Sequence, residues 1–192
     1  MSEIDNLIHR LDVWLQENRP GYYATLNPGA TEQEIQSLEE RLGWKLPDDL
    51  ATFYRWKAGT SHVEVENDRY GFIYFWDILD FSDIAEEKSY ISNPKLLPFA
   101  TDGSGSFLLL DSSGYETGVL FQVLNLVKGD IGNITNSSFK LWLKAQLYLM
   151  ESGAFEAWAE GDDATYWRQK EQMPDFDPGF SRDFDVYEIL EG

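Results

Sequence analysis

The amino-acid sequence predicts an α+β fold, in which a small, mostly antiparallel β-sheet is packed with N-terminal helices and a C-terminal helix. Apolar residues recur at helical spacing within residues 4–58 and again from residue 137. Between these segments lie short aromatic and β-branched runs separated by glycine-containing turns, a pattern typical of strands. Because helical and strand segments are grouped along the chain, the order favours α+β over a series of βαβ units.

The first predicted helix covers residues 4–18, and residues 18–28 after it are rich in turn-forming residues. The apolar face of this helix consists of Ile4, Leu7, Ile8, Leu11 and Leu15.

A helical corner follows within residues 27–59. Thr31 and Glu34 form a capping box at its start, in which each side chain accepts a hydrogen bond from the other residue's N–H group. The apolar stripe of this helix is Ile35, Leu38 and Leu42.

Gly43 ends that helix as a left-handed residue, and Pro47 begins the second helix of the corner, where a missing N–H group costs nothing. Asp48 and Asp49 lie beside the positive end of the helix dipole. We expect Leu50, Phe53 and Tyr54 to form the buried side, and Arg55, Lys57 and Gly59 to close the helix.

The middle of the chain is predicted to supply the strands. Residues 70–76 are an aromatic and β-branched run, consistent with a strand that is buried on both faces. Asp83 and Glu86 are predicted to cap a short helix that stops before Pro94. Three further strands are predicted at 96–100, 106–111 and 118–126, with turns at 102–105 and 112–114.

A last long helix begins at Ser137 and completes a domain of residues 1–152. Residues 153–192 are an acidic, aromatic-rich C-terminal extension. Helical fragments are predicted in it at 154–159 and 165–173. Its large apolar side chains would otherwise face water, so we expect the extension to pack on the domain. These side chains are Phe176, Phe180, Phe184, Tyr187 and Leu190.

The formal net charge of the chain is −19, from 34 acidic and 15 basic residues. The last 42 residues are about three times denser in net negative charge than the rest. Such a field repels phosphate backbones and anionic membrane surfaces and attracts cationic partners. Solubility alone would account for the same acidity. The charge therefore favours a basic protein over a nucleic acid or a membrane as a partner without naming one, and no oligomeric state follows from the sequence.

The chain has no cysteine, so it has neither a disulfide framework nor thiol chemistry. Its N-terminus lacks the basic and apolar layout of a secretory signal. No apolar run approaches the roughly 20 residues that a membrane span needs. A cytoplasmic protein is the expectation.

No catalytic, cofactor or metal site is expected. His62, Glu64 and Glu66 alternate along one predicted strand and could line up as metal ligands, but an exposed polar strand edge accounts for the same pattern. The run at 103–106 resembles a nucleophile turn, but a strand rather than a helix follows it, so we interpret it as a hairpin turn. A DNA-binding helix-turn-helix is disfavoured because its second helix would present aspartates to phosphates.

Exposed acidic residues remain as candidates for partner binding. They lie in a predicted acidic loop, in a glycine-rich turn, and in the turn between residues 111 and 116. The candidates are Glu64, Glu66, Asp68, Asp102, Asp111 and Glu116. Each one alone is compatible with an ordinary solvated loop, whereas together they would suit docking to a basic protein.

Two segments resemble the SUKH superfamily. The first is Pro28-Gly29-Ala30-Thr31, Glu34-Ile35, Leu38-Glu39, Leu42-Gly43, Leu46-Pro47-Asp48-Asp49-Leu50, Tyr54 and Gly59. The second is Leu97-Pro98-Phe99-Ala100, Asp102-Gly103 and Phe107 to Asp111. Their order and spacing, over roughly residues 27–125, carry the resemblance. That superfamily includes yeast-type regulators of cell-wall and glucan synthesis and bacterial immunity proteins that neutralise toxins.

The resemblance implies a non-enzymatic protein-binding domain with a mostly antiparallel sheet. Together with the acidity, it leads us to expect an immunity protein that neutralises a basic toxin. The alternative that it implies is a regulatory or scaffold protein in cell-wall polysaccharide synthesis. A hydrolase that uses two carboxylates is a remote third class, because 34 acidic residues make some carboxylate pair inevitable.

Overall fold

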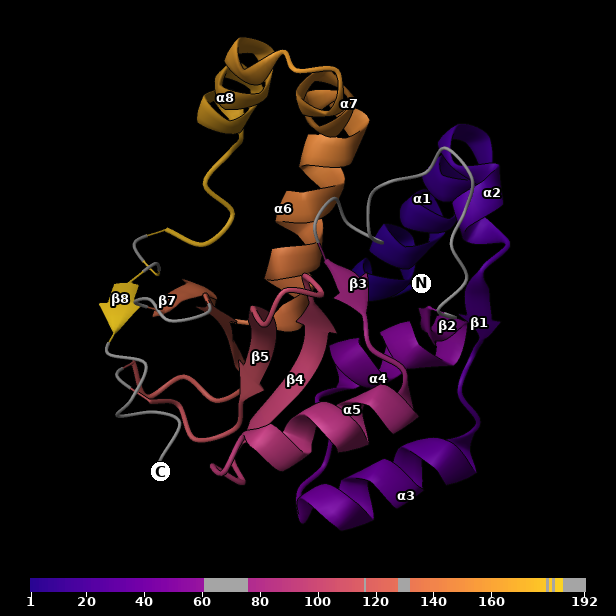
Figure 1. The fold of residues 1–192 in the computed structure, drawn as a ribbon, viewed down its shortest axis with the longest axis vertical. Helices are drawn as coiled ribbons and strands as arrows, with labels where there is room; N and C mark the ends of the chain where they lie inside the picture. The colour runs from indigo at the N-terminus through magenta and orange to yellow at the C-terminus, as the bar shows by residue number, and fades with distance from the viewer. Residues whose placement is uncertain (61–75, 116, 128–131, 179, 181, 185–192) are drawn as a thin grey trace.

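The protein is described by a computed structural model that covers residues 1–60, 76–115, 117–127, 132–178, 180 and 182–184. The described chain contains a six-stranded antiparallel sheet, a two-stranded sheet, and helices against them (Figure 1). The helices are α1 (Glu3–Asn18), α2 (Pro20–Tyr23), α3 (Glu32–Leu42), α4 (Asp48–Trp56), α5 (Phe81–Glu87), η1 (Lys88–Tyr90), α6 (Phe139–Glu151), α7 (Ala154–Ala159) and α8 (Asp163–Gln172). The predicted α+β class is confirmed.

The larger sheet has the strand order β3-β4-β5-β6-β7-β8, and every neighbouring pair is antiparallel. Its strands are β3 (Asp77–Ile78), β4 (Leu96–Thr101), β5 (Phe107–Asp111), β6 (Gln122–Leu126), β7 (Gly132–Asn136) and β8 (Arg182–Phe184). The smaller sheet pairs β1 (Leu26–Pro28) with β2 (Lys57–Thr60). It lies next to α1 and α4, on the far side of the molecule from β8 (Figure 1).

The larger sheet is buried on both faces. Along β5, Leu108 and Leu110 belong to the main core, whereas Leu109 belongs to a smaller core on the opposite face. This alternation follows from the period of two along a strand. The main core is formed with α1, α4 and α6, and the smaller one includes Leu124 and Ile134.

Aromatic side chains join α4, β4 and α6 in the main core. The Phe139 ring lies 5.1 Å from that of Phe53 and 5.5 Å from that of Phe99, in edge-to-face geometry. The Phe99 ring also lies 5.3 Å from that of Trp142. Such pairs contribute about 0.5–1.5 kcal/mol each beyond their buried area. They therefore hold the helical corner firmly against the sheet.

Most predicted helix starts are confirmed, with small shifts. The Thr31 and Glu34 capping box is present, and Gly43 adopts the left-handed conformation with φ of 75°. Pro47 is the N-cap of α4 rather than its first helical residue. Helix α6 starts one residue late, because Ser138 is its N-cap.

The predicted cap of the short helix is wrong. Asp80, not Asp83, is the N-cap of α5, and its carboxylate accepts hydrogen bonds from the N–H groups of Ser82 and Asp83. Glu86 lies within that helix and plays no part in the cap. The helix therefore begins two residues before the predicted cap.

The predicted strands at 96–100 and 106–111 are confirmed as β4 and β5, within one residue. The third prediction was too long, because residues 118–121 form a turn and β6 starts at Gln122. Strands β1, β2, β3, β7 and β8 were not predicted. Of the strand predicted at 70–76, only Trp76 is described, and it is a single bridge residue next to β3. The possible ligands His62, Glu64 and Glu66 lie outside the described residues.

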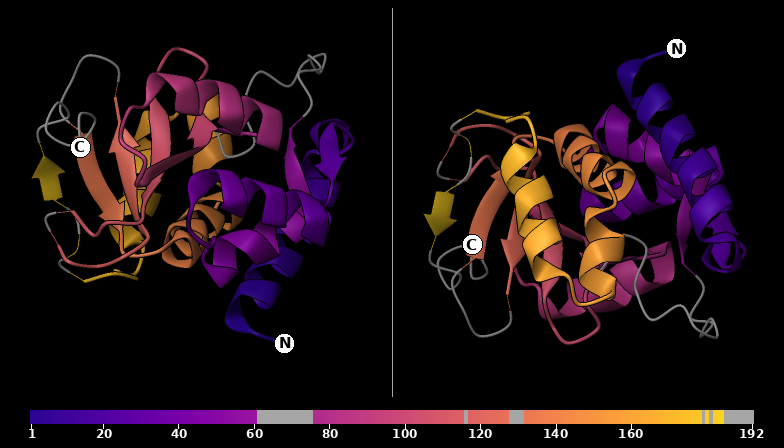
Figure 2. Two further views of the ribbon diagram at one scale, coloured as in Figure 1. Left: turned by 90° about the horizontal axis from the view of Figure 1, so that it is seen from below. Right: turned by 90° about the horizontal axis from the view of Figure 1, so that it is seen from above.

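The described part of the C-terminal extension contacts the rest of the chain. Ala154 and Phe155 are buried in the main core, and α7 and α8 lie side by side beyond the end of α6 (Figure 2). Further along, Asp177 accepts a 2.5 Å hydrogen bond from the N–H group of Ser137. Strand β8 adds to the edge of the sheet beside β7. The division of the chain at residue 152 stays a prediction.

Candidate partner-binding site

The structure does not gather the acidic residues that the sequence predicted as a partner-binding set. Glu64, Glu66, Asp68 and Glu116 lie outside the described residues. Asp102 and Asp111 are described, and they lie at opposite ends of β5: Asp102 in the turn that precedes the strand, and Asp111 as its last residue. These two carboxylates therefore do not share a site.

Asp102 shapes its own turn. Its Oδ1 atom accepts hydrogen bonds from the N–H groups of Ser104, at 2.8 Å, and Ser106, at 2.9 Å. Partial burial acts to raise the pKa of the Asp102 carboxyl, but the hydrogen bonds from Ser106 and Ser104 outweigh it and leave the pKa below its ordinary value. The carboxylate is only half-buried, so a role in partner binding stays a prediction.

The exposed, partner-binding role predicted for Asp111 is wrong, because this residue is 0% exposed. Its carboxylate accepts hydrogen bonds from the N–H and hydroxyl groups of Ser113, at 2.8 and 2.6 Å, and from the N–H of Tyr115, at 2.8 Å. The side chain of Gln122, also fully buried, donates a fourth bond of 2.8 Å. Asp111 therefore organises the loop between β5 and β6 from inside the protein.

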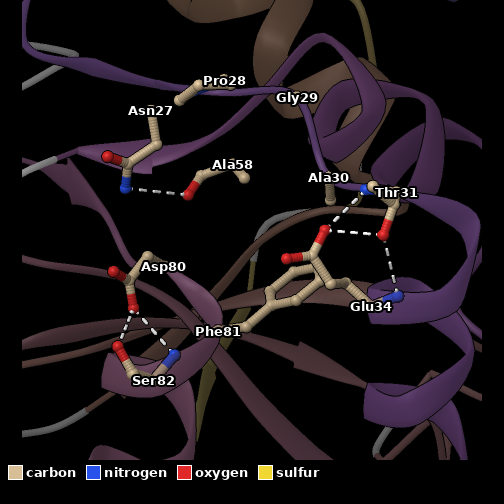
Figure 3. Close-up of a pocket in the computed structure, with 10 residues that line it drawn as sticks. All are labelled: Asn27, Pro28, Gly29, Ala30, Thr31, Glu34, Ala58, Asp80, Phe81 and Ser82. Carbon is tan, nitrogen blue, oxygen red and sulfur yellow. Dashed lines mark hydrogen bonds between the residues drawn. The ribbon is translucent and has the colours of Figure 1, made fainter.

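A different acidic site lies where the first turns of α3 and α5 meet the small sheet. An open pocket there has a cavity volume of about 490 Å³ (Figure 3). It is lined by Asn27, Pro28, Gly29, Ala30, Thr31, Glu34, Ala58, Asp80, Phe81 and Ser82. We call it the acidic pocket, because Glu34 and Asp80 are the charged residues in this set.

Glu34 is held in place by the capping box of α3. Its Oε2 atom accepts hydrogen bonds from the N–H and hydroxyl groups of Thr31, both at 2.8 Å. These bonds lower the pKa of the Glu34 carboxyl, so it stays ionised; the bond from the Thr31 N–H has the larger effect and the bond from its hydroxyl the smaller. Its other oxygen, Oε1, has no hydrogen-bond partner among the described residues and points away from Thr31, toward the side of the pocket where Asp80 lies (Figure 3).

Asp80 lies across the pocket from Glu34 (Figure 3). As the N-cap of α5, its Oδ1 atom accepts from the N–H and hydroxyl groups of Ser82, at 2.7 and 2.6 Å, and from the N–H of Asp83. The described lining contains no lysine, arginine or histidine.

Two glycines let the walls of the acidic pocket approach each other. A Cβ atom on Gly29 would lie 1.9 Å from the carbonyl oxygen of Arg55. Gly59 has a φ of 86°, and a Cβ atom there would lie 2.6 Å from the backbone nitrogen of Asp80. Only glycine allows such contacts. A hydrogen bond of 2.8 Å from the N–H of Ala30 to the carbonyl of Tyr54 completes the junction.

Sequence reasoning did not identify this site. Glu34 was recognised only as a capping residue, and Asp80 was not singled out. The aspartate that precedes Phe81, Ser82 and Asp83 is a local signal for an N-cap. Nothing local shows that this cap lies across a pocket from the cap of α3, because the two are far apart along the chain.

Two other features are absent from the part of the chain that the structure describes. Among these residues there is no group of three or more histidine, cysteine, aspartate or glutamate side chains that could hold a metal ion. Within the same described ranges, no helix is both long enough and apolar enough to cross a membrane.

Comparison with known proteins places most of this architecture in one family. The model of the SMI1 / KNR4 family (SUKH-1) matches residues 29–145, which is more than half of the chain. The match includes α3, α5 and most of the acidic pocket, and it ends within α6. No curated protein matches the chain.

Proposed function

Because the chain belongs to the SMI1 / KNR4 family (SUKH-1), we propose that it is a non-enzymatic protein-binding domain with a basic protein partner. In this proposal it is an immunity protein, which neutralises a toxin in the cytoplasm by occupying a basic face that the toxin needs. A nuclease toxin fits this description, since a surface that holds phosphates must be basic.

The observation that carries the proposal is the acidic pocket on a chain of net charge −19. Opposite charges on two proteins raise the rate of encounter, and the effect weakens as salt screens the field. A lysine or arginine side chain of the partner fits the pocket chemically, because Oε1 of Glu34 points away from Thr31, toward the side of Asp80. Charge-assisted hydrogen bonds to such an oxygen are stronger than neutral ones.

The pocket is prepared for a cation before binding. The capping box holds the Glu34 carboxylate, and Asp80 is held by three hydrogen bonds at the start of α5. Side chains that are already ordered lose little conformational entropy on binding. The site is open to water, so salt screening applies to it and the pocket supports fast association more than extreme affinity.

The same family membership is compatible with a second role, a regulator or scaffold in cell-wall polysaccharide synthesis. That role would use the same acidic surface on a different partner. Neighbouring genes distinguish the two: an adjacent toxin gene favours immunity, and genes for polysaccharide synthesis favour regulation.

The test is to isolate the partner by crosslinking in the native host, and then to measure its association rate over a range of salt concentrations. We expect a basic protein whose association rate falls on the order of tenfold between low and high salt. The Glu34→Gln variant should associate more slowly. The matched control is Glu171→Gln, which removes one charge from the exposed surface of α8. A partner that is not basic, or an association rate insensitive to salt, contradicts the proposal.

A further inference from the structure

A second cavity lies between α3 and α5, at the opposite ends of these helices from the acidic pocket. Its volume is about 440 Å³, and Leu38, Arg41 and Leu42 of α3 line one side. Ile84 and Lys88 are among the residues on the other side. The chemistry is opposite to that of the acidic pocket, because the described lining contains two cations and no acidic residue.

The two cavities lie at opposite ends of two parallel helices, α3 and α5. The N-caps Thr31 and Asp80 both line the acidic pocket, so the two helices begin side by side and run in the same direction (Figure 1). Glu34, Leu38 and Arg41 follow each other at spacings of four and three residues, and therefore share one face of α3. We call this feature the α3–α5 groove.

Arg41 is free to meet a partner. It is exposed in the last turn of α3, and its guanidinium makes no ion pair or hydrogen bond with any described residue. A cation there also complements the negative end of the helix dipole. The helix is nevertheless capped by the backbone: Gly43 is left-handed, and its N–H group donates to the carbonyl of Glu39. The guanidinium of Arg41 is therefore not needed as a cap.

Lys88 lies at the end of α5, on the other side of the groove. Its ammonium donates to the carbonyl oxygens of Ile91, at 2.9 Å, and Asn93, at 2.6 Å. Burial lowers the pKa of Lys88, which is consistent with its position at the wall of the cavity. An ammonium has three donors, so one remains after these two bonds.

The floor between the charged ends is apolar. Leu38, Ile84 and Ile91 are buried below it, while Leu42 remains half-buried beside Arg41. An apolar floor with a few charged groups at defined places is the usual composition of a recognition groove.

We propose that the α3–α5 groove receives one segment of the partner protein in a fixed polarity. A cationic residue of that segment enters the acidic pocket, an apolar residue covers the Leu38 and Leu42 floor, and an acidic residue pairs with Arg41. The proposal rests on the proposed function, because it concerns the same partner, and it adds a contact of opposite charge. From Glu34 to Arg41 the helix advances about 10 Å, and the first and fifth residues of an extended chain lie about 13 Å apart.

The test uses two pentapeptides blocked at both ends, Lys-Ala-Leu-Ala-Glu and Lys-Ala-Leu-Ala-Lys, added to the isotope-labelled full chain. Amide resonances report binding at each end of the groove. We expect the first peptide to shift resonances at both ends. In the Arg41→Glu variant, the first peptide should bind about fivefold more weakly and the second about fivefold more tightly. The control Arg168→Glu makes the same charge change on the exposed surface of α8 and should alter neither affinity.

The outcomes separate the two proposals. If both peptides respond equally to Arg41→Glu and bind only at the acidic pocket, the polarity proposal is overturned and the proposed function is unaffected. If neither peptide shifts resonances near Glu34, the acidic pocket itself is not a cation site, and the proposed function loses its support. A native amide spectrum of each variant establishes that the fold is retained.

Discussion

The hydroxyl of Tyr54 donates a 3.2 Å hydrogen bond to the backbone carbonyl of Leu79, and Tyr54 is 0% exposed. This bond joins α4 to the residue that precedes the N-cap of α5. The ring of Tyr54 also packs edge-to-face on that of Phe81, at 4.9 Å. The position of Asp80, between Leu79 and Phe81, is therefore set from inside the core.

A first prediction concerns stability at high pH. Burial raises the pKa of Tyr54 well above its ordinary value, and the nearby negative charge of Asp80 adds a smaller increase. Above a pH of about 10, the unfolded chain loses this proton and the folded chain keeps it. The contribution of Tyr54 to the free energy of unfolding is therefore constant below that pH and falls above it, by about 1.4 kcal/mol per pH unit.

Urea unfolding of the wild type and of Tyr54→Phe, from pH 8 to pH 11, measures this contribution. At pH 8 the variant should be less stable by about 1 kcal/mol, the value of one hydrogen bond. Above the titration of free tyrosine, its stability should fall less steeply than that of the wild type. The same substitution at the exposed Tyr90 is the control and should leave the slope unchanged. Equal slopes for the wild type and Tyr54→Phe would refute the prediction.

A second prediction concerns the buried carboxylate of Asp111. The Asp111→Asn variant keeps the shape of the side chain but replaces one acceptor oxygen with a donor that faces other donors. We expect the free energy of unfolding to fall by about 2–4 kcal/mol, because at least one buried hydrogen bond to a charged group is lost and a donor is left unpaired. Chemical unfolding measures this loss.

The comparison variant is Asp102→Asn, since that carboxylate also accepts hydrogen bonds from the N–H groups of its own turn but remains half-exposed. Water can replace part of what is lost there, so we expect a cost of about 1 kcal/mol. Equal costs at Asp102 and Asp111 would show that burial does not set the difference.

The contrast between these aspartates shows which features the sequence could predict. Helix caps could be predicted because their hydrogen bonds join residues three apart, as between Thr31 and Glu34. Whether an aspartate in a turn is exposed depends on its place in the sheet. Asp111 ends a central strand and is covered by Gln122 of the next strand, and no local pattern contains that information.

The turn before β6 was also missed because a contact between distant segments decides it. Val119 and Phe121 have strong strand propensity, so the pattern predicted a strand there. In the structure the N–H of Phe121 bonds the carbonyl of Asp111 at 2.6 Å, and Phe121 has a φ of 65°. Its ring lies 5.7 Å from that of Trp44, a contact between distant segments that overrides local propensity. The acidic pocket depends on the same kind of contact, because its two carboxylates come from different helices.

A third prediction concerns the glycine at the back of the acidic pocket. In Gly29→Ala the new methyl group would overlap the carbonyl oxygen of Arg55, 1.9 Å away, so the backbone must move. Overpacking against backbone costs about 1–3 kcal/mol. Gly161→Ala is the control, because its φ is 84° but its Cβ atom would meet nothing within 4 Å.

We expect Gly161→Ala to cost about 1 kcal/mol from backbone strain alone and to leave binding unchanged. Gly29→Ala should lower both the free energy of unfolding and the affinity of the Lys-Ala-Leu-Ala-Lys peptide. Unfolding curves and resonance shifts measure the two effects. If Gly29→Ala binds the peptide normally, the close approach of the two backbones is not what forms the pocket.

A fourth prediction separates the two roles of the capping box. Thr31→Ala removes the N-cap of α3 and should reduce stability by about 1 kcal/mol. Glu34→Gln retains the box, because glutamine can accept from the N–H of Thr31 as glutamate does. Its unfolding midpoint should therefore remain close to that of the wild type, while the pocket loses one negative charge. Binding of the Lys-Ala-Leu-Ala-Lys peptide should weaken in Glu34→Gln.

The distinction between the two variants lies in their salt dependence. The wild-type affinity for that peptide should fall as salt rises, and the fall should be shallower in Glu34→Gln, because one charge fewer contributes. Thr31→Ala keeps the charge, so its salt dependence should match that of the wild type even where its affinity differs. Parallel salt curves for the wild type and Glu34→Gln would mean that the Glu34 carboxylate caps α3 and does nothing more. Divergent curves would assign it the second role, that of an electrostatic contact held in place by the cap itself.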